Sequence, residues 1–311
     1  MITRRSLIAA TGAASAALIA APAFAQAWKA QYPELVFAVV PAENASGVMD
    51  RYASFVEYLS KEIGAKVTLR VANDYAAVIE GQRAGNVHIG YYGPASFAKA
   101  RIIGVKTDAF CIDVNSDGTK GYYSVFYVRA TSPYKPIEDL KGKAFGLVDP
   151  NSTSGYNMPL FKLDKLGIKP ESFFSKMVVT GSHENAVVAL AQGTVDVAAN
   201  WWNADDDSNL TRMLTKHMVR DKSGNELKKE DFRVILKSDL IINSPTAMLA
   251  SLPDDLKAKV KEAYFNAATK APEAFAKLSD GKNLPWAPIG NADYDDTIKL
   301  VRFVDGLRKS S

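Results

Sequence analysis

Residues 35–71 read LVFAVVPAENASGVMDRYASFVEYLSKEIGAKVTLRV, and this stretch carries the pattern that decides the fold. Its first six residues form a short apolar run typical of a buried strand, and Lys66–Val71 at its end alternates as a strand does. Between them, Ala45–Gly64 carries apolar residues at helical spacing and ends in a glycine that can cap a helix. A strand, a helix and a second strand in this order predict a parallel α/β sheet.

The same alternation of strand-like and helix-like segments continues along the rest of the chain. Strands are expected at 87–92, 122–129, 144–148, 174–179, 195–199 and 246–250. We therefore predict two α/β lobes, with lobe one formed by residues 27–125 plus 246–311 and lobe two by residues 130–240. Residues 126–129 and 241–245 would then be hinge segments, because a lobe inserted into another is joined to it by two crossings.

The composition limits the class of protein. The chain has 311 residues, of which 47% are hydrophobic and 23% charged, as in ordinary globular proteins, and the length favours two domains. The formal net charge of +4 gives no reason to expect nucleic acid. A single cysteine, Cys111, excludes an internal disulfide, and His88, His183 and His217 show no metal-ligand spacing. We expect neither a metal nor a cofactor.

The N-terminal residues 1–25 resemble an export signal. Arg4 and Arg5 precede an uncharged run that ends in the small-x-small pattern Ala23-Phe24-Ala25. The paired arginines favour the twin-arginine route, and an ordinary secretion signal is the alternative. No other run of 18 apolar residues follows. The sequence therefore predicts cleavage near Ala25 and a soluble, periplasmic, monomeric mature chain.

Three adjacent hydroxyl residues, Ser152, Thr153 and Ser154, lie in the segment DPNSTSG at 149–155, between an expected strand and an expected helix. The first amide groups of a helix have no partner within it, so they point outward and attract anions. The hydroxyls would add donors, and Gly155 would let an oxyanion approach the backbone. An anion site and an ordinary helix cap both fit these residues.

Several segments, in order along the chain, resemble the phosphonate-binding proteins of ABC importers: Asn73–Ala76, Tyr92–Ser96, Gly121–Ser124, Leu140–Lys143, Asp149–Gly155, Gly181–Glu184 and Val195–Ala198. The resemblance implies the type II, two-lobed periplasmic solute-binding fold, with the ligand in the cleft between lobes. It implies a binding protein and not an enzyme. Such a protein closes around a phosphonate or phosphite and delivers it to a membrane permease and its ATPase.

Other functions stay open from the residues alone. The chain could bind another tetrahedral oxyanion, such as a sulfonate or phosphate, or serve a sensor kinase instead of a transporter. A phosphoester hydrolase would need a metal cluster or an activated nucleophile, and Ser152 lacks the GxSxG surroundings of one.

The resemblance also assigns the site residues. Ser152, Thr153 and Ser154 are implied to donate to the phosphonate oxygens. His183, at another strand-to-helix junction, would contact the same oxygens as a hydrogen-bond donor. On lobe one, the resemblance implies that Tyr75 and Tyr122 face the ligand, with Tyr92 as a further candidate.

The chain departs from the family pattern where an aminoalkyl group would bind. Family members that bind 2-aminoethylphosphonate place two carboxylates in the cleft, and the matching positions here are Asn203 and a residue near Ser244. Asp205–Asp207 could restore one carboxylate after a small shift in register. Trp201 could narrow the pocket, face a methylated ammonium or pack at the hinge. We expect a small or neutral substituent on the ligand.

Overall fold

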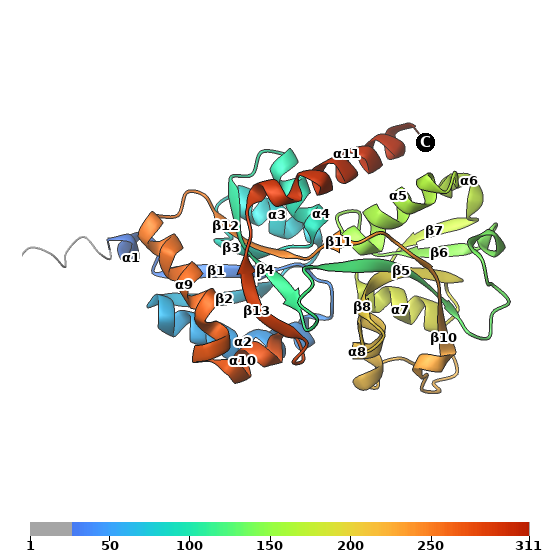
Figure 1. Cartoon of the computed structure of the whole chain (residues 1–311), viewed down its shortest axis with the longest axis horizontal. Helices are drawn as coiled ribbons and strands as arrows, with labels where there is room; N and C mark the ends of the chain where they lie inside the picture. Colours follow the sequence, from blue (N-terminus) through green and yellow to red (C-terminus); the bar gives the residue numbers. More distant parts are fainter. Residues whose placement is uncertain (1–26, 311) are drawn as a thin grey trace, which may run out of the picture.

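The computed structural model describes residues 27–310, and these residues form two α/β lobes side by side (Figure 1). The first sheet has the order β13-β4-β12-β3-β1-β2. Its strands are β1 (Glu34–Val39), β2 (Lys66–Val71), β3 (Ile89–Tyr91), β4 (Thr107–Asn115), β12 (Pro245–Leu249) and β13 (Asn283–Pro288). The two-lobed α/β architecture predicted from the sequence is confirmed.

The second sheet has the order β10-β5-β8-β6-β7, with β11 paired to β5 and β9 paired to β8. Its strands are β5 (Gly121–Arg129), β6 (Ala144–Leu147), β7 (Lys176–Val179), β8 (Val197–Ala204), β9 (Asp207–Ser208), β10 (Phe232–Lys237) and β11 (Ile241–Ile242). In each lobe a parallel core, β2-β1-β3 or β7-β6-β8, is completed by antiparallel strands.

The helices pack around these sheets. In lobe one they are α1 (Trp28–Gln31), α2 (Ala45–Ile63), α3 (Tyr75–Arg83), α4 (Pro94–Ile102), α9 (Asp254–Lys270) and α10 (Pro272–Leu278). In lobe two they are a single π-helical turn η2 (Thr153–Asn157), α5 (Met158–Lys165), α6 (Pro170–Phe173), α7 (His183–Ala191) and α8 (Asn209–Thr215). No helix within residues 27–310 is long and apolar enough to cross a bilayer.

Helix α2 shows how local sequence sets an element and its packing. Asn44 caps the helix, because its side-chain oxygen accepts from the Gly47 amide at 2.8 Å. The helix ends at Gly64, whose φ of +76° favours glycine. The buried Phe55 on its inner face meets Tyr264 of α9 edge to face, with ring centroids 5.2 Å apart. This contact ties the two helices into one hydrophobic core.

The chain crosses between the lobes at residues 116–120 and at Asn243–Ser244. The first crossing lies earlier than the predicted hinge at 126–129. Those residues are in the middle of the second sheet, where Phe126 pairs with Ala199 and Arg129 with Phe232. The prediction failed because 121–129 forms one continuous strand. The second crossing is shorter than the predicted 241–245, since Ile241–Ile242 still pairs with β5.

The C-terminal helix α11 (Asp295–Ser310) contacts both lobes, although the sequence assigned it to lobe one (Figure 1). Asp305 pairs with Lys99 of α4 at 2.7 Å. On the same helix, the ring of Phe303 meets Phe161 of α5, with centroids 5.5 Å apart. A helix of 16 residues is about 24 Å long and extends past the nine-residue α4 onto the next lobe.

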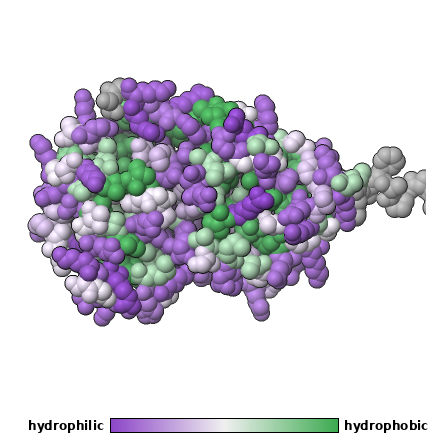
Figure 2. Space-filling view, turned by 180° about the vertical axis from the view of Figure 1, so that it is seen from behind, coloured by the Kyte–Doolittle hydropathy of each residue, from purple (hydrophilic) through white to green (hydrophobic). Residues whose placement is uncertain are grey.

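The expected export signal falls on residues 1–26, which lie outside the described residues. Seen from behind, the molecule carries mostly hydrophilic residues with several separate apolar patches (Figure 2).

Replacing Phe55 by alanine should lower the free energy of unfolding by about 3–5 kcal/mol, because it leaves a cavity between α2 and α9. Urea unfolding of the purified chain measures this change. The control is Met49→Ala on the same helix, where the side chain is 46% exposed and the cost should stay within about 0.5 kcal/mol. Equal costs in both variants would contradict the packing described.

Candidate functional site

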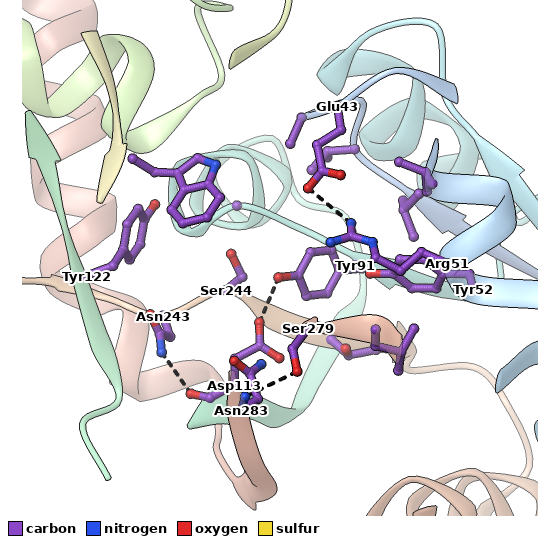
Figure 3. Close-up of a pocket in the computed structure, with 18 of the residues that line it drawn as sticks. Glu43, Arg51, Tyr52, Tyr91, Asp113, Tyr122, Asn243, Ser244, Ser279 and Asn283 are labelled. Atoms are coloured by element: carbon purple, nitrogen blue, oxygen red, sulfur yellow. Dashed lines mark hydrogen bonds and ion pairs between the residues drawn. The ribbon is translucent and has the colours of Figure 1, made fainter. Parts of the chain in front are cut away.

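A cavity of about 170 Å³ lies between the two lobes. An apolar cavity of about 150 Å³ is known to hold a benzene molecule, so the space admits a ligand of several non-hydrogen atoms. Figure 3 shows part of its wall, with Tyr122 at one side, Glu43 and Arg51 at the other, and Tyr91 above Asp113 between them.

Four helical N-termini meet at one end of the cavity. Tyr75 is the first residue of α3, Gly93 precedes α4, Ser152 precedes η2 and α5, and His183 is the first residue of α7. All four residues line the cavity. Because each N-terminus carries unpaired amides and partial positive charge, this end of the cavity favours an anion. We call it the oxyanion end.

The Ser152–Ser154 turn is buried at this end, each residue being at most 2% exposed. Ser152 acts as a cap, since its Oγ accepts from the Gly155 amide at 3.1 Å. Thr153 Oγ1 accepts from the Ala95 amide of α4 at 2.8 Å, so its own hydroxyl hydrogen stays available to a ligand. The three hydroxyls therefore differ in role, and one of them also joins the lobes.

Gly155 serves packing rather than the ligand approach expected from the sequence. A Cβ at this position would lie 2.3 Å from Val148 Cγ2. Its amide donates to Ser152 Oγ and its carbonyl accepts from the Val148 amide at 2.9 Å. Both backbone groups are therefore used within the turn.

His183 is buried as a neutral imidazole with a fixed tautomer. Asn200 Oδ1 accepts from the Trp201 amide, and Asn200 Nδ2 donates to the His183 carbonyl, each at 2.9 Å. His183 Nδ1, which lies 2.9 Å from Asn200 Oδ1, is therefore the protonated nitrogen. Nε2 presents a lone pair and lies 3.3 Å from Ser152 Oγ. The sequence predicted a donor, whereas the atom facing the turn is an acceptor.

Burial lowers the pKa of His183 to about 4, so the ring stays uncharged at neutral pH. The cationic ring that the sequence allowed does not form under those conditions. Anion binding at this end therefore depends on amides, hydroxyls and helix N-termini.

Of the three tyrosines predicted from the sequence, two line the cavity and one does not. Tyr75 and Tyr122 line it, and burial raises both pKa values, that of Tyr122 to about 12, so both are neutral donors. Tyr122 lies on β5 of the second sheet and not on lobe one as predicted. Tyr92 is fully buried in the core, where its hydroxyl donates to Gln82 Oε1 at 2.8 Å. Its neighbour Tyr91 faces the cavity instead.

Trp201 and Asn203 of β8 both line the cavity. The Arg212 guanidinium lies 4.9 Å from the centroid of the Trp201 ring, so one face of that ring is covered. Asn203 Nδ2 donates to Asp207 Oδ2 at 2.7 Å. The three aspartates 205–207 do not form part of the cavity wall, among the residues described. Asp207 pairs with Arg212 at 3.1 Å, and Asp206 pairs with Lys282 of the other lobe at 2.6 Å.

The end of the cavity away from the turn contains polar residues that the sequence analysis missed. Asp113 of β4 accepts from the Tyr91 hydroxyl at 2.7 Å and from Trp286 Nε1 at 2.8 Å. Glu43 pairs with Arg51 at 3.1 Å. One signal was visible in the sequence, since Asp113 interrupts an otherwise apolar strand segment.

Direct hydrogen bonds between the lobes show a closed arrangement. Glu184 Oε2 of lobe two accepts from the Asn44 amide at 2.7 Å and from Asn44 Nδ2 at 2.9 Å. The His183 amide donates to the Ala42 carbonyl at 3.2 Å. Since His183 and Thr153 both line the cavity and both contact lobe one, closure also completes the oxyanion end.

Two α/β lobes joined by two crossings, with a polar cavity between them, define a two-lobed solute-binding protein. Residues 37–294 match the family described as ABC transporter, phosphonate, periplasmic substrate-binding protein. The chain belongs to this family, which consists of transport proteins that bind substrates.

Relatives and solved structures agree with this assignment. The phosphonates-binding periplasmic protein of Escherichia coli is 33% identical over 83% of this chain and 72% of the relative. The phosphate-import protein PhnD of Mycolicibacterium smegmatis is 30% identical over 89% of this chain and 88% of the relative. A binding protein component of an ABC phosphonate transporter from Pseudomonas aeruginosa has a TM-score of 0.72 at 26% identity, covering 87% of this chain and 84% of that one.

Acidification should destabilise the protein through His183. The unfolded histidine binds a proton as the pH falls below about 6.5, whereas the buried ring stays neutral down to about 4. The free energy of unfolding should therefore fall by about 3 kcal/mol across this window from this group. Urea unfolding at pH 7 and pH 4.5 measures the change.

The variant His183→Gln should lose that part of the pH dependence, whatever its stability at pH 7. The matched control is His217→Gln, because the side chain of His217 is 72% exposed. An unchanged pH slope in His183→Gln would show that His183 is not buried as a neutral ring.

Proposed function

We propose that the mature chain captures a phosphonate or phosphite in the periplasm by closure of its two lobes and delivers it to the permease of an ABC importer. The observation that carries this proposal is the meeting of four helical N-termini at the oxyanion end. A tetrahedral P–O group there would receive backbone amides and the hydroxyls of Tyr75, Tyr122, Thr153 and Ser154. No arginine contact is needed for this recognition.

Binding would be coupled to closure because the ligand-facing groups come from both lobes. Tyr75 and Gly93 belong to lobe one, whereas Ser152–Ser154 and His183 belong to lobe two. A ligand shifts the equilibrium toward the closed form only through contacts absent from the open form. Contacts of one phosphonate with Tyr75 and with Ser152–Ser154 would be of this kind, since they reach groups of both lobes at once.

The remaining parts of the proposal follow from the family. The protein would act as a monomer, without catalysis, and its partners would be the membrane permease and the ATPase. Residues 1–25 would direct export and would then be cleaved off near Ala25. The membrane subunits would recognise the closed shape and release the ligand.

Replacing Thr153 by valine, which keeps the shape and removes the hydroxyl, should weaken methylphosphonate binding about 10- to 100-fold. Hydrogen bonds to charged groups contribute about 1.5–3 kcal/mol, and the Ala95 amide would also lose its acceptor. Isothermal titration calorimetry with phosphite, methylphosphonate, phosphate and taurine measures this. Thr215→Val, on the exposed side of α8, is the control and should bind as the wild type does.

Failure of the wild-type chain to bind phosphite and methylphosphonate would overturn the proposed function. Binding of taurine or phosphate alone would assign the oxyanion end to another tetrahedral anion. Unchanged binding by Thr153→Val would remove this hydroxyl from the site.

Glu184→Gln should reduce the apparent affinity for methylphosphonate about 5- to 10-fold, because a charged acceptor for two Asn44 N–H groups becomes neutral. The change acts on closure, so small-angle X-ray scattering should show a larger open fraction at subsaturating ligand. Glu230→Gln, at an exposed position, is the control. Equal affinity and scattering in both variants would contradict a role for Glu184 in closure.

A further inference from the structure

The cavity has opposite hydrogen-bonding character at its two ends. The oxyanion end presents amides and hydroxyls that can donate. Elsewhere the wall presents oxygen acceptors from Asp113 and Asn243, which a hydrogen bond joins, and from Asn203 of β8; we call these three residues the acceptor end. A ligand that fits both ends needs an anionic group and a separate group rich in hydrogen-bond donors.

Asp113 carries the negative charge of the acceptor end, and no ion pair neutralises this charge among residues 27–310. Among residues 27–310, four carboxylate or guanidinium side chains line the cavity, and they belong to Glu43, Arg51, Asp113 and Arg212. Glu43 pairs with Arg51, and Arg212 pairs with Asp207 behind the wall. Asp113 has no ion-pair partner within residues 27–310, and Arg51 and Arg212 act on it only at a distance. A carboxylate enclosed in protein without a paired cation is costly.

The side chains around Asp113 hold it in place and leave acceptor capacity free. One of its oxygens accepts a hydrogen bond from the neutral Tyr91 hydroxyl (Figure 3), and the other accepts one from the neutral Trp286 indole. A carboxylate oxygen can accept a second bond. Because Asp113 is half-buried and lines the cavity, its accessible surface faces a ligand.

Two amide oxygens extend the acceptor set. Asn243 Nδ2 donates to the Asp113 carbonyl at 2.9 Å and to Asn115 Oδ1 at 3.1 Å, which fixes its Oδ1 as the free atom. Asn203 Nδ2 donates to Asp207, so its Oδ1 is free in the same way. Within residues 27–310, neither oxygen receives a side-chain or backbone donor. A primary ammonium has three N–H donors and one positive charge, which matches a carboxylate with neighbouring amide oxygens.

We propose that Asp113 determines ligand specificity by binding the ammonium group of an aminoalkylphosphonate whose phosphonate lies at the oxyanion end. The proposal rests on the proposed function and names its substrate class. The acceptor comes from β4 of lobe one, and not from Asn203 or Ser244, where the family pattern places carboxylates. The ammonium would thus be held by lobe one, whereas the phosphonate would contact groups of both lobes. We therefore propose a cationic substituent on the ligand, in place of the small or neutral substituent expected from the sequence.

The test compares 2-aminoethylphosphonate with propylphosphonate, which has nearly the same shape and no charge at its end. Isothermal titration calorimetry of the wild-type mature chain should show at least about 30-fold tighter binding of 2-aminoethylphosphonate. Asp113→Asn should lose at least about 30-fold in affinity for 2-aminoethylphosphonate and keep its affinity for propylphosphonate within a few-fold. A merely structural role of Asp113 would weaken both ligands equally.

Asp254→Asn is the matched control, because it makes the same substitution at a carboxylate whose side chain is 98% exposed and lies outside the cavity. This variant should keep the preference for 2-aminoethylphosphonate. If Asp113→Asn does not fold, the two ligands compared on the wild-type chain still decide the question. Equal or weaker binding of 2-aminoethylphosphonate by the wild type overturns the proposal.

The same titrations separate failure of this inference from failure of the proposed function. Binding of propylphosphonate and methylphosphonate without a preference for the amine would leave the proposed function standing and remove the ammonium site. No binding of any of the three phosphonates, or of phosphite, would overturn both.

Discussion

The meeting of four helical N-termini at one point is the constraint on which the rest of this structure depends. It follows from the parallel order of the strands, because a helix that follows a strand begins at the carboxyl edge of the sheet. Strands β2, β3, β6 and β7 lead in this way into α3, α4, η2 with α5, and α7. The two lobes face each other through these edges, so closure brings the four N-termini together. An anion taken out of water there recovers in fixed amides and hydroxyls part of the hydration it has lost.

The hydrogen bonds behind this end keep its groups in place before a ligand arrives. Asn200 fixes the tautomer of His183, His183 Nε2 faces Ser152, and Ser152 caps the turn that contains Thr153 and Ser154. The neutral His183 ring in this hydrogen-bond network lets the turn stay buried without an unpaired charge. The same network uses part of the hydrogen-bonding capacity of Ser152 and His183. Recognition of an oxyanion therefore falls more to Thr153, Ser154 and the two tyrosines than to the full set that the resemblance suggested.

The sequence predicted the two-lobed fold and most of the cavity wall, and its errors have physical causes. Strand and helix periodicity located the elements, and ordered motifs pointed to the segments at the carboxyl edges. Periodicity could not decide which of Tyr91 and Tyr92 faces the cavity, because β3 is only three residues long. It predicted the strand at 122–129 to within one residue of β5, but it could not show that the crossing between the lobes precedes this strand, since a turn and a hinge have similar composition. Asp113 was missed because its partners Tyr91 and Trp286 are 22 and 173 residues away along the chain.

The cavity wall contains two carboxylates, Glu43 and Asp113, whose charges are compensated to different degrees. Glu43 is neutralised by Arg51 within its own lobe, so it adds little net charge to the cavity. Asp113 receives only two neutral donors, and burial raises its pKa while those donors lower it. The fold thus keeps one charge incompletely compensated on lobe one, whereas the oxyanion end combines helical N-termini of both lobes. Closure assembles the oxyanion end in the same cavity that Asp113 lines, so a single ligand with charges of both signs would contact both at the moment of closure.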